Sequence, residues 1–182
     1  MLDRFPSWVL PLLALLGSPL ISLAETSSET SAPLSLDSPC ASPERRQFDF
    51  WIGDWRVELP DGSLAGTNRI TPTLDGCGLE EHWMGARGMT GRSFNYFDPS
   101  DQQWHQTWID SRGGALLLAG RFDAGEMRLS GATRTATGAE VINRITWTPQ
   151  GPDLVRQVWE TSTDRGTTWS VVFDGRYNRV RS

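Results

Sequence analysis

The sequence predicts an all-β domain, an up-and-down antiparallel β-barrel of about ten strands with a short N-terminal helical turn. From Trp55 onward, β-rich runs alternate with turn signals of Gly, Pro or Asp at spacings of about ten to twelve residues. Helical periodicity is confined to one turn at 43–50. Strands joined by such short loops run antiparallel, and a meander of this length tends to close and so remove its edges.

The expected strands follow from these alternations in chain order. Each is bounded by residues suited to tight turns, such as Pro60-Asp61-Gly62 after the first strand and Thr137-Gly138 after the seventh. A further turn, Ser162–Trp169, fits the S-x-D-x-G-x-x-W hairpin known from sialidases, in which the Asp ties the turn and the Trp packs beneath it. The strands are expected at 55–59, 64–74, 79–86, 90–97, 104–110, 115–122, 126–136, 139–148, 153–163 and 169–180.

The N-terminus predicts an export signal. A weakly charged start precedes the almost wholly apolar segment 8–23, which ends in small residues. This layout is typical of a secretory signal cleaved before Glu25. A retained membrane anchor is the alternative, but the apolar segment is short for a span and contains two prolines. We expect a signal peptide at 1–24, a flexible linker rich in Ser, Thr and Pro at 25–43, and the barrel at 44–182.

Composition excludes several classes of function. The formal net charge is -5, and all 17 basic residues are Arg, scattered along the chain. Such a chain has no electrostatic footprint for nucleic acid, so we expect no nucleic-acid partner. The lack of Lys also excludes Schiff-base chemistry. The expected protein is periplasmic or secreted, has no stable membrane insertion after cleavage, and binds a small molecule; its oligomeric state is not predicted.

Two cysteines, Cys40 and Cys77, remain after the expected cleavage. In an oxidising compartment an even pair predicts a disulfide. In the chain-entropy model a loop of this length would stabilise the fold by about 4 kcal/mol. A catalytic thiol or a metal pair is the alternative, although no His lies near either cysteine in the sequence.

The segment Phe48–Trp55, Phe-Asp-Phe-Trp-Ile-Gly-Asp-Trp, contains Gly-x-Trp directly before the first strand. It resembles the opening of lipocalins and other calycins, where the Trp plugs the closed end of the barrel and a late Arg stacks on it. The resemblance implies structural roles for Gly53 and Trp55, with Arg176 or Arg179 as the stacking arginine.

The region 44–179 as a whole resembles an uncharacterised bacterial lipocalin-like family. Its members open with a similar Phe-Asp-Phe-Trp-x-Gly-x-Trp and have runs similar to Gly76-Cys77, 104–110 and 173–175. This resemblance implies a fold and a pocket but no activity. The nitrobindins, a related group of barrels, bind haem through a His near the C-terminal strands. Because this sequence has no His after His105, we expect no haem and no other cofactor.

Tryptophans share strand faces with polar side chains. Residues two apart on a strand lie on one face, so Gln106 accompanies Trp108 and Gln157 accompanies Trp159. If these faces point inward, the lumen is aromatic with sparse polar groups, which is typical of a small-molecule site. Ordinary core packing of each Trp is the alternative. We expect a hydrophobic or amphipathic ligand to contact Trp83, Asn95, Gln106, Trp108, Gln157 and Trp159.

A lumen carboxylate offers a second hypothesis, a cofactor-independent isomerase, cyclase or hydrolase. Glu81 and Asp110 share faces with tryptophans, and an apolar lumen would raise the pKa of either carboxyl toward that of a general acid or base. His82 and His105 lie on the opposite faces, so the sequence predicts no metal site and no Ser-His-Asp triad. A third possibility is a filled barrel whose exposed Trp and Arg bind a partner.

Strand counting places the two ends of the barrel. Trp55 begins the first strand, so the closed end should lie where that strand starts. The odd-numbered connections, at 60–62, 87–88, 112–114, 137–138 and 164–166, should then surround an entrance at the far end. The second connection returns to the closed end, where Cys77 could reach Cys40.

Overall fold

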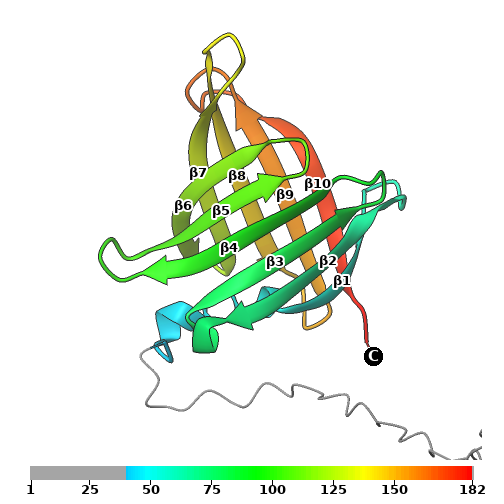
Figure 1. The fold of residues 1–182 in the computed structure, drawn as a ribbon, viewed down its shortest axis with the longest axis vertical. Coiled ribbons are helices and arrows are strands. Elements are labelled where there is room, and N and C mark those ends of the chain that lie inside the picture. Colours follow the sequence, from blue (N-terminus) through cyan, green and yellow to red (C-terminus); the bar gives the residue numbers. More distant parts are fainter. Residues whose placement is uncertain (1–39, 182) are drawn as a thin grey trace, which may run out of the picture. The chain divides into compact units, whose positions relative to one another are not determined.

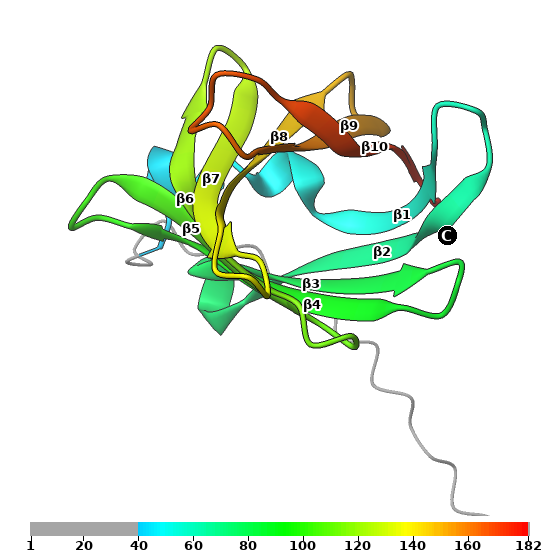
Figure 2. The same cartoon turned by 90° about the horizontal axis from the view of Figure 1, so that it is seen from above.

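The computed structural model describes residues 40–181. Within this part of the chain, ten strands form a closed barrel in which each strand pairs antiparallel with its sequence neighbours and β1 pairs with β10 (Figure 1). Seen from above, the strands follow one another around the barrel (Figure 2). The fold class predicted from the sequence is therefore confirmed. The expected signal peptide, residues 1–24, and the expected linker up to residue 39 lie outside the described residues.

The strands begin and end within two residues of the predicted positions. Three short 3-10 helices accompany them: η1 (Pro43–Arg46), η2 (Asp49–Trp51) and η3 (Leu74–Gly76). The strands are β1 (Gly53–Glu58), β2 (Leu64–Thr73), β3 (Gly78–Gly85), β4 (Thr90–Asp98), β5 (Gln103–Asp110), β6 (Ala115–Asp123), β7 (Glu126–Arg134), β8 (Glu140–Pro149), β9 (Leu154–Ser162) and β10 (Ser170–Arg179). Burial alternates along them, most regularly in β4, as a half-buried sheet requires.

Aromatic side chains from the N-terminal segment fill one end of the barrel. Phe48 and Trp51 are fully buried, and their rings stack with centroids 4.9 Å apart. Phe48 also makes edge contacts with Trp104 and Trp147, at centroid distances of 5.5 and 5.2 Å. These rings close the end of the barrel where β1 begins, so that any opening into the lumen lies at the other end.

The Gly-x-Trp segment is fixed against the last strand. The Arg179 guanidinium lies 4.1 Å from the centroid of the Trp55 ring and donates hydrogen bonds to the carbonyls of Ile52 (2.7 Å) and Pro152 (2.9 Å). Gly53 has a φ of 141°, and a Cβ there would lie 2.1 Å from Arg179 Nη1. Glycine is needed at this position because the arginine occupies the space of a side chain. Arg176, the other candidate, is exposed.

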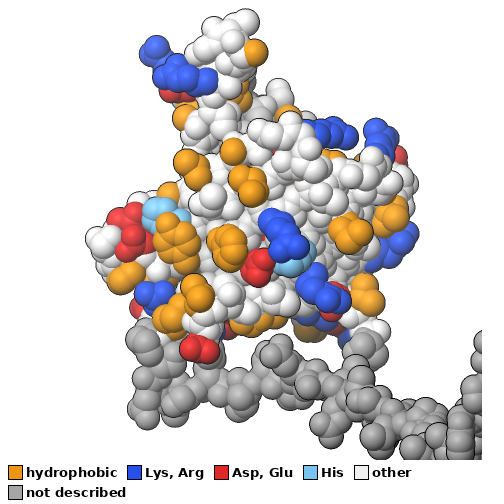
Figure 3. All heavy atoms as spheres, in the orientation of Figure 1, with side chains coloured by type: hydrophobic (Ala, Val, Ile, Leu, Met, Phe, Trp, Pro, Cys, Tyr) orange, Lys and Arg blue, Asp and Glu red, His pale blue; other side chains and the backbone are white. Residues whose placement is uncertain are grey.

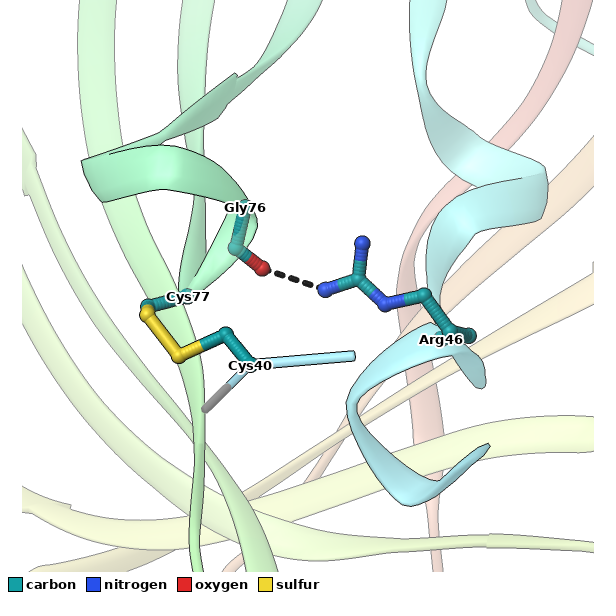
Figure 4. The surroundings of a disulfide bond; sticks show 4 residues. All are labelled: Cys40, Arg46, Gly76 and Cys77. Atoms are coloured by element: carbon teal, nitrogen blue, oxygen red, sulfur yellow. Dashed lines mark hydrogen bonds between the residues drawn. A yellow bond between two sulfur atoms is a disulfide. The ribbon is translucent and has the colours of Figure 1, made fainter. Parts of the chain in front are cut away.

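The predicted disulfide is confirmed. Cys40 and Cys77 are bonded, with their Cα atoms 4.9 Å apart (Figure 4). The Arg46 guanidinium donates a hydrogen bond to the carbonyl of Gly76 in the same connection. This β2–β3 connection lies at the end of the barrel where β1 begins, since Gly53 pairs with Ile70 near the end of β2. The disulfide and the aromatic plug therefore share one end, as the strand count predicts.

The hairpin between β9 and β10 is tied by a carboxylate. Asp164 accepts hydrogen bonds from Ser162 Oγ (2.7 Å), Thr168 Oγ1 (2.6 Å) and Thr168 N (2.8 Å). The hydrogen bonds from Thr168 and then Ser162 lower the pKa of Asp164 to about 2. Trp169 donates to the Gly166 carbonyl at 3.1 Å, and the Arg144 guanidinium lies 3.8 Å from the centroid of the Trp169 ring.

No helix among residues 40–181 is long and apolar enough to cross a membrane.

Candidate ligand-binding cavity

A cavity of about 120 Å³ lies in the half of the barrel beyond the aromatic plug. Its walls come from the inward positions of strands on all sides of the barrel, together with Met89 in the β3–β4 connection at the far end. Six of the residues that line the cavity were predicted from the sequence, five as ligand contacts and Glu81 as a candidate base. They are Glu81, Trp83, Gln106, Trp108, Gln157 and Trp159. The other lining residues are Met89, Leu116, Ile145, Phe173 and Tyr177.

A network of buried polar side chains forms the floor. The Glu81 carboxylate accepts from Asn68 Nδ2 at 2.7 Å and from Ser93 Oγ at 2.6 Å. Asn95 Nδ2 donates to Ser93 Oγ at 2.9 Å, and Gln106 Nε2 donates to Asn95 Oδ1 at 2.8 Å. Asn95 does not line the cavity itself, but it contacts Gln106 directly and Glu81 through Ser93. Burying these groups is tolerated because they satisfy one another.

Burial dominates the electrostatics of the floor. It raises the pKa of Glu81 to about 7, although the hydrogen bonds from Ser93 and Asn68 act in the opposite direction. Burial, and next the charge of Glu81, raise the pKa of Tyr177 well above its ordinary value. The Tyr177 hydroxyl donates to Gln157 Oε1. Near neutral pH the Glu81 carboxyl can therefore exist in either protonation state, while Tyr177 remains a neutral phenol.

Two polar atoms of the floor have no partner within the described part of the chain. Gln106 Oε1 and Gln157 Nε2 make no hydrogen bond, although both residues line the cavity. Asn68 Oδ1, on the amide that donates to Glu81, is buried and also unpaired. Because both glutamines line the cavity, the floor has capacity for hydrogen bonds with a bound molecule.

Aromatic rings form the walls toward the far end. Trp83 is buried, whereas Trp108, Trp159 and Phe173 are only half-buried. Trp83 and Phe173 meet edge to face with centroids 6.1 Å apart. The Trp159 indole donates to Asn143 Oδ1 at 3.1 Å, which holds its orientation. The cavity thus changes from a buried polar floor to partly exposed aromatic walls.

Inward glycines make room for these rings. A Cβ on Gly91 would lie 2.1 Å from Trp108, one on Gly175 would lie 2.6 Å from Phe173, and one on Gly66 would lie 2.9 Å from Trp83. Real Cβ atoms do not approach other atoms so closely. The Trp108 and Trp83 rings therefore occupy space that a side chain on the neighbouring strand would fill, and the Phe173 ring occupies the space of a side chain two residues along its own strand. The rings lie against the barrel wall for this reason.

Asp110 has a different environment from Glu81. Its Oδ1 accepts from the backbone N–H groups of Arg112 (2.8 Å) and Gly114 (3.0 Å), which ties the β5–β6 turn. Partial burial acts to raise the pKa of Asp110, but the hydrogen bonds from Gly114 and Arg112 outweigh it and the pKa is lowered. The raised pKa expected of a lumen carboxyl therefore belongs to Glu81 and not to Asp110.

The β4–β5 turn brings one His together with two carboxylates. Within the described residues, Asp98, Asp101 and His105 alone place three potential metal-ligand atoms within 4.8 Å of one another. Asp98 and Asp101 also accept backbone hydrogen bonds in the turn, from Ser100 N at 2.8 Å and Gln103 N at 3.0 Å. His105 Nε2 lies 2.9 Å from Asp101 Oδ2. Turn formation accounts for the arrangement without a metal ion.

The outer face of β3–β6 carries exposed apolar side chains, shown in Figure 3 as separate groups between polar and charged atoms. Glu80 accepts from Arg92 at 3.1 Å and lies 2.7 Å from His82 in the same region. His82 Nε2 thus lies on the outer side of the barrel, and His82 does not line the cavity, as strand parity predicts. The exposed apolar residues of this face are Met84, Phe94, Tyr96, Ile109 and Leu117.

By its fold the protein is a ten-stranded antiparallel β-barrel that contains a cavity, an architecture consistent with a lipocalin-like fold. No model of a known protein family matches the sequence, and no curated protein matches it significantly. The chemistry of the cavity is therefore the basis for inferring function.

Proposed function

We propose that this protein is exported and binds a small hydrophobic or amphipathic molecule in the barrel, as a member of the lipocalin-like family that its opening motif resembles. The cavity itself carries this proposal, because a polar floor, at which Gln106 Oε1 and Gln157 Nε2 have no partner among the described residues, lies beneath aromatic walls. Sites for small molecules combine apolar walls with few polar anchors in this way. An oxidising compartment is supported by the Cys40–Cys77 disulfide.

The size of the cavity limits the ligand. An engineered protein cavity of about 150 Å³ accepts benzene, and the cavity here is about 120 Å³. A single ring fits this scale, so a molecule with one ring and a short polar chain would place its polar end at Glu81, Gln106 and Gln157 and extend toward the partly exposed far end. Larger ligands would have to extend past Trp108 and Trp159 toward the far end.

Calorimetric titration with single-ring compounds tests the proposal. Trp108→Ala removes a wall and should weaken binding at least tenfold. Trp169→Ala is the matched control, because Trp169 belongs to the β9–β10 hairpin and does not line the cavity. Unchanged affinity in Trp108→Ala, or no binding by any compound at millimolar concentration, would refute the proposal.

Sequencing the N-terminus of protein recovered after export should give Glu25, and an uncleaved chain would contradict the signal-peptide assignment.

The pKa of Glu81 favours a second candidate, a cofactor-independent isomerase, cyclase or hydrolase. A carboxyl with a pKa of about 7 in a cavity has the proton affinity that suits a general acid or base near neutral pH. Compounds found to bind would be incubated with the protein and followed by NMR. Turnover that Glu81→Gln abolishes without loss of binding would support catalysis, whereas ligands that remain unchanged would leave binding as the function.

A further inference from the structure

We propose that the cavity selects a small amphipathic amine, whose ammonium group pairs with the Glu81 carboxylate while its apolar body contacts the indole rings of the wall. This inference depends on the proposed binding function and narrows it to one chemical class.

The Glu81 carboxyl has no cation from the protein to pair with. None of the described residues that line the cavity is basic, and the two groups that bond to the carboxyl are an amide and a hydroxyl. Among residues 40–181, the other titratable group that faces it is the Tyr177 phenol. The side chains around the carboxyl are all neutral: Asn68 on β2, Ser93 on β4, Gln106 on β5, Gln157 on β9 and Tyr177 on β10.

A buried carboxylate without a counter-ion is unfavourable, and the protein relieves this by protonating it at a pKa of about 7. A bound ammonium group would supply the missing counter-ion and favour the ionised carboxylate. A ligand carboxylate would instead add a second negative charge, and an alcohol would supply no charge. The floor should therefore prefer amine over alcohol, and alcohol over carboxylate.

The hydrogen-bonding capacity of the floor fits the same class. An ammonium group has three N–H donors and no acceptor. The floor offers the Glu81 oxygens, and Gln106 Oε1 lines the cavity without a partner within the described part of the chain. Gln157 Nε2 is an unpaired donor at the same floor. Among the cavity-lining polar atoms described, the Glu81 oxygens and Gln106 Oε1 are acceptors, so acceptors outnumber donors where the polar end of the ligand would lie.

The aromatic wall lies near enough to Glu81 to share the cation. Trp83 is two residues along β3 on the same face as Glu81, and its partner on β4 is Gly91. The Trp108 ring lies over that same glycine, so it leans across β4 toward Trp83. Indole faces attract ammonium groups and their adjacent CH₂ groups, most strongly where water is excluded. Carboxylate and rings therefore act on the same ligand.

Amine binding has a distinctive pH dependence. The bound state needs an ionised Glu81 and a protonated amine, so below pH 7 binding must release the proton of Glu81. Affinity should rise with pH, by up to tenfold per unit below pH 7, and level off above it until the amine itself deprotonates near its own pKa, about 10. Tyr177 stays protonated over this range and contributes no slope. A neutral ligand should show no such rise.

Calorimetry with 2-phenylethylamine, 2-phenylethanol and phenylacetate tests the inference, since the three differ only in the polar end. At pH 8 we expect the amine to bind at least tenfold more tightly than the alcohol and phenylacetate to bind most weakly. Glu81→Gln should weaken the amine at least tenfold and leave the alcohol within threefold. Glu80→Gln is the control, because the same change one residue away lies on the outer face.

The outcomes separate the two proposals. Alcohol binding as tight as amine binding would overturn the amine inference and leave the binding function standing. Binding by none of the three would overturn both. If Glu81→Gln fails to fold, the pH dependence of wild-type binding decides: amine affinity that does not rise between pH 5.5 and pH 7.5 contradicts the inference, and a rise that the alcohol lacks supports it.

Discussion

Replacing Glu81 by Gln should change how the stability of the protein depends on pH. The substitution keeps the size of the side chain, and an amide can still accept from Asn68 and donate to Ser93. It removes the one carboxyl that the described residues place at the cavity floor. The difference between wild type and variant therefore isolates the effect of ionising this buried group.

The magnitude follows from the pKa of Glu81, which rises from 4.5 to about 7 on folding because the carboxyl is buried. Such a shift corresponds to about 3 kcal/mol. The folded state binds the proton of Glu81 more tightly than the unfolded state, so protonation of Glu81 stabilises the folded protein. This stabilisation is present in full below pH 4.5 and is lost as pH rises to about 7. Above pH 7 the ionised carboxylate is fully unfavourable.

Urea unfolding at intervals between pH 4.5 and pH 8 measures this effect. The stability of wild type relative to Glu81→Gln should fall by about 3 kcal/mol across that range. Other groups, including Asp164, titrate in both proteins and cancel in the difference. Glu80→Gln, on the outer face, should give a curve without this fall. Parallel curves for wild type and Glu81→Gln would refute the assignment of a raised pKa to this carboxyl.

Three further substitutions test how the barrel is held together. Gly91→Ala should force the indole that lies over it from its site, destabilising the protein by about 1–3 kcal/mol and altering its near-UV circular dichroism; unchanged spectra and stability would contradict this. Cys40→Ser should lower the free energy of unfolding by about 4 kcal/mol, the value for a closed loop of this length, and a loss below about 1 kcal/mol would show that the disulfide contributes little. Arg179→Met removes hydrogen bonds to carbonyls and the cation over Trp55, and should cost about 2–4 kcal/mol in urea unfolding, whereas the exposed control Arg176→Met should cost less than about 0.5 kcal/mol.

Alternation and turn chemistry were sufficient to predict the fold. Gly, Pro and Asp separate every pair of strands, so the strand ends are local properties of the chain and the structure reproduces them within two residues. An up-and-down meander also fixes which connections share an end. That is why the meeting of Cys40 with Cys77 beside the plug could be predicted before any distance was known.

The polar floor could be predicted only in part. Glu81, Gln106 and Gln157 each lie two residues from a tryptophan on the same strand face. This spacing predicts that they face inward with the tryptophans. Asn68 shares a strand face with Gly66 and Ile70, and this strand has no Trp to mark the inward side. Tyr177 lies between Arg176 and Arg179, which do not indicate an inward face. Alternation predicts which residues face inward, but which of them touch depends on the register of strands far apart in the sequence.

The turn at Asp98–His105 shows the same limit for local clusters. The sequence separates His105 from Asp98 by seven positions, and parity alone places it on the outer face of its strand. The turn folds back so that both aspartates reach the imidazole. Such proximity depends on turn geometry, which residue spacing alone does not define.

The cavity remains open because of the glycines, despite the large aromatic rings around it. Three tryptophans and a phenylalanine surround the far half of the lumen, and side chains of this size could fill a barrel completely. Trp83 and Trp108 instead lie over glycines on neighbouring strands, and Phe173 lies over Gly175 on its own strand, which lets each ring rest against the wall. The plug is different, since Phe48 comes from the turn between η1 and η2 and packs against both Trp104 and Trp147. One end of the barrel is therefore closed by rings that enter the lumen. The other end stays open because its rings pack against the wall over glycines.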